Sequence, residues 1–250
     1  MRYKQMQLNI LSFTLVTLIA TTGLAMAEED SPLSFNVGIV SHYLARGVSQ
    51  SANHAAVQGG IDYGHSSGFF LGTWASTIDF SGTGNPDPVD RPRYEWDIYA
   101  GFGKTMGDFG YNIQLTYYTY PDENADNWNY SELGVSGTWK ILTIGMEYTW
   151  MGEPPTGQPY REGDLYYYGK LSYGLPMDIK LSGTLGYYDF DVSDTTNTKF
   201  DYTHWQIALS RDFGLFGSFS ISYDQNNGGA GHFVAFDDDA KFSVGWKKTF

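Results

Sequence analysis

The sequence predicts an all-β protein, a transmembrane antiparallel up-and-down β-barrel of about 12 strands that follows a cleaved signal peptide. From Leu33 onward, segments of roughly ten residues alternate apolar and polar side chains with a period of two, which is typical of tilted membrane-spanning strands. Odd-numbered connections between the segments are long and polar, whereas even-numbered ones are short. Even-stranded barrels with both termini on the periplasmic side have this asymmetry. Aromatic residues also flank the apolar faces, as an interfacial girdle requires.

Composition agrees with one large all-β domain. The chain has 250 residues, of which 17% are aromatic, with 20 Tyr and 30 Gly, a mixture that suits strands at a water–lipid boundary. No cysteine is present, which excludes disulfides and thiolate metal sites. A net charge of −13 argues against a nucleic-acid partner. No apolar run of 18 residues follows the N-terminal segment, which excludes a helical-bundle membrane protein.

The N-terminal segment, residues 1–27, reads as a secretory signal peptide. Arg2 and Lys4 make it basic, an apolar stretch covers residues 8–20, and Ala25-Met26-Ala27 is a small-residue cleavage site. A single transmembrane anchor is the alternative, but the apolar run is short for a bilayer. Cleavage would leave residues 28–250 as a single outer-membrane barrel domain and change the charge from −13 to −15.

The strands are expected in order along the chain. Their ranges are residues 33–46, 57–63, 69–80, 93–102, 111–117, 132–138, 142–150, 165–171, 179–187, 204–210, 218–224 and 242–250. In the first, Leu33 and Tyr43 are expected on the apolar face and Arg46 on the polar one. Residues 48–53 are expected to be a polar loop. The fourth strand is the clearest, because Trp96 and Ile98 alternate with charged residues that a helix would have spread around its axis.

We expect the apolar faces to point outward to lipid and the polar faces to point into the lumen. A soluble sandwich would bury the apolar faces and has no reason for the loop asymmetry. In lipid, only a closed barrel satisfies every backbone group of the strands.

The closing segment resembles the terminal strand by which outer-membrane barrels are recognised for assembly. Gly245, Trp246 and Phe250 form the expected assembly signal. Lys248 departs from the pattern, because a hydrophobic residue is usual there.

Several segments resemble the TorF family of porins. They are Tyr43-Leu-Ala-Arg46-Gly47-Val-Ser49-Gln50, Ala56-Val-Gln58-Gly59-Gly60-Ile-Asp62-Tyr63, Gly68-Phe-Phe-Leu-Gly72-Thr-Trp74-Ala-Ser76, Glu95-Trp-Asp97-Ile-Tyr99-Ala-Gly101 and the closing Lys248-Thr-Phe250. The resemblance covers the mature chain and implies an outer-membrane barrel with a pore. It implies no substrate.

Charged residues on the polar faces are expected to line the lumen: Arg46, Asp62, Arg93, Glu95, Asp97, Glu132, Glu147, Lys170, Lys180, Asp224 and Lys247. Acidic and basic walls would impose a transverse field on a solute and so set ion selectivity. The alternative is a plugged lumen in which these groups pair with one another.

The function expected is an outer-membrane porin-like channel that allows passive diffusion of small hydrophilic solutes, and the number of strands favours a monomer. Its partners would be outer-membrane lipid, lipopolysaccharide and the barrel-assembly machinery, with no cofactor. A non-conducting adhesion or scaffold barrel is one alternative. A barrel lipid hydrolase is another, but only His65 and Ser66 are adjacent candidates and no catalytic set is predicted.

Acidic residues are concentrated in the long loops: Asp87, Asp90, Asp122, Glu123, Asp126, Asp191, Asp194, Asp237, Asp238 and Asp239. They could bridge to lipopolysaccharide through divalent cations, or form a solvated, repelling surface. No EF-hand spacing is present, so no metal site is predicted.

Overall fold

The computed structural model describes residues 32–80, 92–121, 128–152, 154, 159–191, 200–228 and 238–250. The predicted signal peptide, residues 1–27, lies outside these residues. So do most of the acidic loop positions, namely Asp87, Asp90, Asp122, Glu123, Asp126, Asp194 and Asp237.

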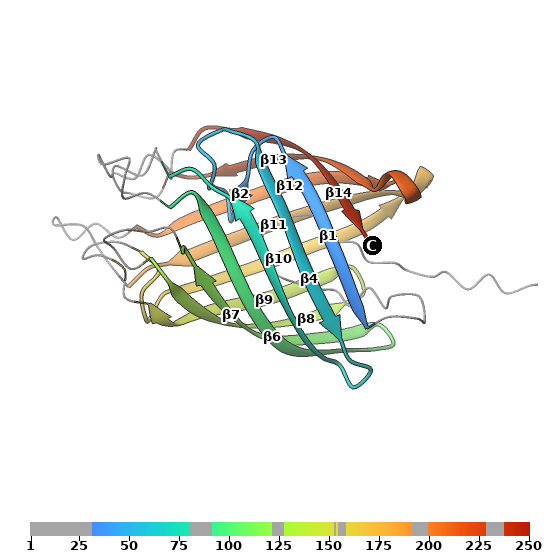
Figure 1. Cartoon of the computed structure of the whole chain (residues 1–250), viewed down its shortest axis with the longest axis horizontal. Coiled ribbons are helices and arrows are strands. Elements are labelled where there is room, and N and C mark those ends of the chain that lie inside the picture. The colour runs from blue at the N-terminus through green and yellow to red at the C-terminus, as the bar shows by residue number, and fades with distance from the viewer. Residues whose placement is uncertain are drawn as a thin grey trace, which may run out of the picture.

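Twelve antiparallel strands form a closed barrel, which confirms the predicted fold class. In pairing order they are β1 (Leu33–Val40), β4 (Ala56–Gly64), β5 (Phe69–Thr77), β6 (Tyr94–Met106), β7 (Phe109–Thr119), β8 (Tyr130–Trp139), β9 (Leu142–Gly152), β10 (Leu165–Leu175), β11 (Ile179–Asp189), β12 (Tyr202–Asp212), β13 (Ser218–Asn226) and β14 (Lys241–Thr249). Each strand pairs with its neighbours in this order, as an up-and-down topology requires (Figure 1).

Long and short connections alternate around the barrel, as the sequence predicts. At the short-turn end, strands are joined by residues 65–68, 107–108, 140–141, 176–178 and 213–217, the last two containing the 3-10 turns η1 (Pro176–Asp178) and η2 (Gly214–Phe216). All other connections between barrel strands lie at the opposite end, called here the long-loop end. Within the described residues, no helix has the length and apolarity that a membrane span needs.

The two faces of the strands differ as predicted. In β6, Ile98 is 50% exposed on the outer surface, while its neighbours Glu95 and Asp97 are 3% and 2% exposed on the inner side. Apolar side chains such as Leu71 and Ile207 are exposed around the rest of the wall. A barrel that exposes its apolar residues and buries its charges is suited to a lipid environment and not to water.

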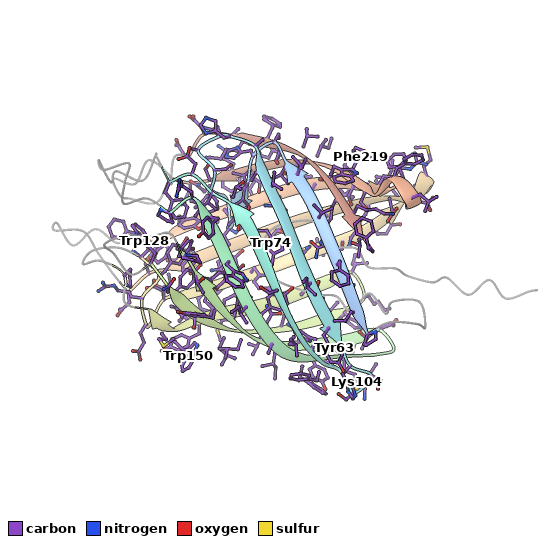
Figure 2. The ribbon with its side chains drawn as sticks, viewed as in Figure 1. Tyr63, Trp74, Lys104, Trp128, Trp150 and Phe219 are labelled. Carbon is purple, nitrogen blue, oxygen red and sulfur yellow. The ribbon has the colours of Figure 1, made fainter. Side chains whose placement is uncertain are left out.

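Large aromatic side chains lie toward both ends of the barrel. Figure 2 shows the exposed Trp150 toward one end and Tyr63 toward the other. Rings with one polar atom are suited to the two interfaces of a membrane, so this distribution agrees with the predicted girdles.

The last strand closes the barrel against the first. The amide of Phe250 donates to the carbonyl of Phe35 at 2.8 Å, and the amide of Phe35 donates back at 3.0 Å. In Figure 1 the red strand β14 lies beside the blue strand β1. Lys248, unusual for its position, donates from Nζ to the carbonyl of Gly214 at 3.1 Å, so it ties the last strand to the β12–β13 turn.

The first strand is shorter than predicted. It ends at Val40, and the chain then turns into the barrel and forms a hairpin of β2 (Leu44–Ala45) and β3 (Val48–Ser49). Tyr43 is therefore buried inside, and the prediction that it faces outward is wrong. The predicted polar loop at residues 48–53 is also wrong in part, because Val48 and Ser51 are buried.

Deleting Phe250 removes both backbone hydrogen bonds to Phe35 and should lower the folded fraction, measured by heat-modifiable migration on a gel. Phe242→Ala is the matched control, because Phe242 and Phe250 are each 70% exposed and the substitution leaves backbone pairing intact. Equal folded fractions for the deletion and the control would contradict a closing role for Phe250.

Candidate functional site: the barrel lumen

The β1–β4 connection, residues 41–55, is the main structure inside the lumen and is called here the inward segment. Its hairpin turns at Arg46 and Gly47, with φ of 51° and 78°. Positive φ at both central residues is the geometry of a type I′ turn, which matches the twist of a hairpin. A Cβ on Gly47 would lie 2.6 Å from the Cβ of His204 on β12. Glycine therefore lets the tip of the hairpin press against the far wall.

Arg46 joins this tip to β8. Its guanidinium forms a bidentate ion pair with Glu132, with Nη1–Oε1 and Nη2–Oε2 distances of 2.8 and 2.5 Å. Nη1 also donates to the hydroxyl of Tyr188 at 2.9 Å, and the ring of Tyr166 lies 4.5 Å from the guanidinium carbon. Burial disfavours the charged form of Arg46, but the Glu132 carboxylate outweighs this and raises the pKa of Arg46 above its ordinary value.

Further hydrogen bonds hold the inward segment to three other strands. Asn226 Nδ2 on β13 donates to the carbonyl of Gly47 at 2.9 Å, and Ser243 Oγ on β14 donates to the carbonyl of His42 at 2.8 Å. Tyr43 donates its hydroxyl to Glu95 on β6 at 3.4 Å. The segment is thus fixed across the lumen and does not merely lie along one wall.

Aromatic side chains fill the space around the inward segment. Two buried clusters contain Val40, Tyr43, Ala56, Ile78, Phe80, Tyr118, Tyr120 and Tyr130 on one side, and Val48, Tyr166, Tyr168, Tyr188, Phe190, Phe200 and Tyr202 on the other. Their rings stack closely, for example Tyr188 on Phe190 with centroids 4.1 Å apart. The long-loop half of the lumen is therefore densely occupied.

Most of the predicted lumen residues point inward. Glu95, Asp97, Glu132 and Asp224 are buried on inner faces, and Asp62, Glu147, Lys170, Lys180 and Lys247 share the inward register and are half-buried. Arg93 lies at an exposed bend before β6. Arg46 points inward as expected, but from the hairpin and not from a strand. That these residues line a conducting path stays a prediction.

Inward charges are segregated around the barrel. Within the described strands, the inward lysines Lys170, Lys180, Lys241 and Lys247 come from β10, β11 and β14, and the inward carboxylates Asp62, Glu95, Asp97, Glu132 and Glu147 come from β4, β6, β8 and β9. Two carboxylates are exceptions. Asp224 on β13 accepts hydrogen bonds from Gln206 at 2.7 Å and Ser222 at 2.8 Å, and Asp212 at the end of β12 accepts hydrogen bonds from the amide of Gly214 and the hydroxyl of Ser218.

Sequence reasoning missed the aromatic half of the site. Tyr166 and Tyr168 alternate with the outward-facing Tyr167 and share the inward face with Lys170, and this alternation is the sign in the sequence that the lumen contains aromatic rings. His204 on β12 is also buried inside, and its Nε2 forms a hydrogen bond with the Tyr166 hydroxyl at 2.7 Å. Gly186 makes room for both, because a Cβ there would lie 2.4 Å from His204 Nε2.

His65 and Ser66, the residues considered for catalysis, do not form a hydrogen-bonded pair. His65 Nδ1 instead lies 2.8 Å from Ser67 Oγ on an exposed turn. In the part of the chain that the structure describes, no group of three His, Asp or Glu side chains has a metal-binding arrangement.

Replacing Glu132 with Gln should destabilise the barrel by about 3–5 kcal/mol, because it leaves the Arg46 guanidinium buried without its counter-charge. Urea unfolding followed by tryptophan fluorescence measures the change. Arg46→Met combined with Glu132→Gln should recover much of the loss. Asp108→Asn, which breaks the exposed Lys140–Asp108 pair, is the control and should change the midpoint little. A Glu132→Gln midpoint no lower than that of the control would contradict the anchoring role.

Comparisons with known proteins agree on the fold. The KdgM porin structure superposes with a TM-score of 0.54 at 10% identity, covering 87% of this chain and 99% of that chain. The NanC porin structure gives a TM-score of 0.52 at 13% identity, covering 87% and 98%. A second KdgM structure, described as a complex with disordered oligogalacturonate, also gives 0.52. At such identities the likeness shows a shared fold.

No curated protein sequence matches the chain. The family model described as "Bacterial protein of unknown function (Gcw_chp)" matches residues 25–250, and the chain therefore belongs to this family.

Proposed function

We propose that this protein is an outer-membrane porin-like channel through which small hydrophilic solutes diffuse passively. The observation that carries the proposal is the combination of a closed barrel, an outer wall of exposed apolar side chains and an inner wall of charged and hydroxyl groups. A bilayer stabilises such an outer wall, and a polar inner wall suits a water-filled path.

The short-turn half of the lumen supports a path for solutes. Its inward positions are small or polar, such as Ser172, Ser182 and Ser210. A Cβ added at Gly174 would meet no atom within 4 Å, so open space borders the wall there. The inward segment restricts the other half, which favours small solutes over large ones.

Relatives by fold and sequence resemblance support the same class. KdgM and NanC are described as porins, and the segments between residues 43 and 101 resemble the TorF family. Outer-membrane lipid, lipopolysaccharide and the barrel-assembly machinery are the further partners that this proposal requires.

A non-conducting barrel is the second candidate, and the inward segment favours it. A buried Arg46–Glu132 pair with aromatic clusters on both sides could close the lumen completely. Single-channel recording in planar bilayers distinguishes the two functions. Stable conductance steps with a panel of anionic, cationic and neutral solutes support the channel, and their absence from correctly folded protein supports the closed barrel.

Removing the inward segment should raise single-channel conductance severalfold. Val40 and Ala56 are directly paired, so an Asn-Gly turn can replace residues 41–55 without moving β1 or β4. His54→Ala, in an exposed part of the same segment, is the control and should conduct like the natural protein. Equal conductance of the shortened and natural chains would show that the segment does not restrict the path.

A further inference from the structure

A patch of cations and hydroxyls lies on the inner wall of β10 and β11, in the short-turn half. The register pairs Lys170 with Thr184, Ser172 with Ser182, and Gly174 with Lys180. All six positions point inward. The two lysines therefore bracket a set of three hydroxyl groups on two neighbouring strands.

Two of these hydroxyls have no hydrogen-bond partner among the described residues. They are Thr184 Oγ1 and Ser172 Oγ, both buried, and Thr184 is only 6% exposed. A buried hydroxyl without a partner costs about 1–3 kcal/mol, so both groups favour a ligand that accepts hydrogen bonds.

The surrounding charges favour an anion. Lys170 and Lys180 lie on the same inner wall, two inward rows apart. In the short-turn half, the inward positions of β10, β11, β13 and β14 contain no carboxylate. The one inward carboxylate on β12 in this half is Asp212, which accepts hydrogen bonds from Gly214 and Ser218 of its own turn. Glu147, on neighbouring β9, lies two inward rows farther toward the long-loop end.

Across the lumen, the inward carboxylate of the short-turn half is that of Asp62, and it is already engaged. Asp62 on β4 accepts hydrogen bonds from Tyr99 and from Asn36. Open space at Gly174 leaves room for a solute beside Lys180. We infer that the β10–β11 patch is a binding site for small oxyanions, carboxylates or phosphates, held by Lys170, Lys180 and Thr184. It rests on the proposed function, because the anion must enter the lumen from water.

Isothermal titration of the folded protein in a zwitterionic detergent tests the site, with succinate and inorganic phosphate as the probes and choline as the cationic comparison. We expect one of the two anions or both to bind, and choline not to bind. Lys170→Gln combined with Lys180→Gln should weaken anion binding at least about tenfold, because charge-assisted hydrogen bonds are lost. Lys104→Gln, a substitution of an exposed lysine on β6, is the control and should bind as the natural protein does.

Thr184→Val keeps the shape of the side chain but removes the hydroxyl, and it should weaken binding severalfold. Because this variant keeps both lysines, it still tests the anion site if the double lysine variant does not fold. No anion binding to the natural protein, or unchanged binding in every folded variant of the patch, would overturn the site.

Recording conductance from the same samples separates this site from the channel. Anion binding without conductance would leave the site standing and overturn the channel. Conductance without anion binding would overturn the site and leave the channel standing.

Discussion

The Arg46–Glu132 ion pair is the interaction on which the interior of this barrel depends. A guanidinium that is 5% exposed is stable there only because a bidentate carboxylate and a tyrosine hydroxyl replace its water. Since Arg46 lies at the tip of the hairpin, the same contacts position the whole inward segment. The aromatic clusters can then pack against a fixed surface on both sides. Without the pair, the segment would be held by single hydrogen bonds and aromatic packing, with no ion pair.

The lumen has two halves with different physical properties. The long-loop half is filled by the inward segment and stacked rings, and in the proposed channel this half would set how wide the path is. The short-turn half has shorter side chains, a lysine and hydroxyl wall on β10 and β11, and open space at Gly174. Restriction and solute binding would thus be separate in position, so substitutions can alter one without the other.

The strands of the barrel can be predicted from the local pattern of the sequence, whereas the structure inside the lumen cannot. Alternation of apolar and polar residues, visible in β6, predicts strand number, the outward face and the inward position of Glu95 and Asp97. The inward segment could not be predicted, because residues 41–46 continue the alternation of the first strand and residues 48–53 have the composition of an ordinary polar loop. Its anchor, Glu132, is 86 residues away in the sequence, and no local period links the two. Lys248 likewise departs from the terminal-strand pattern, and the reason is its hydrogen bond to Gly214 in the neighbouring β12–β13 turn, which the sequence alone does not indicate.

Hydrogen exchange of the backbone amides in the inward segment tests this account most directly, because it needs no substitution. The amide of Tyr43 donates to Ser51 Oγ at 2.9 Å and the amide of Gln50 donates to the carbonyl of Tyr43 at 2.8 Å, both within the segment. Residues 42–51 of the folded protein should exchange as slowly as the strands of the wall, because their amides are hydrogen-bonded and buried. Exchange as fast as that of the exposed turn at residues 65–68 would show that the segment does not stay in the lumen.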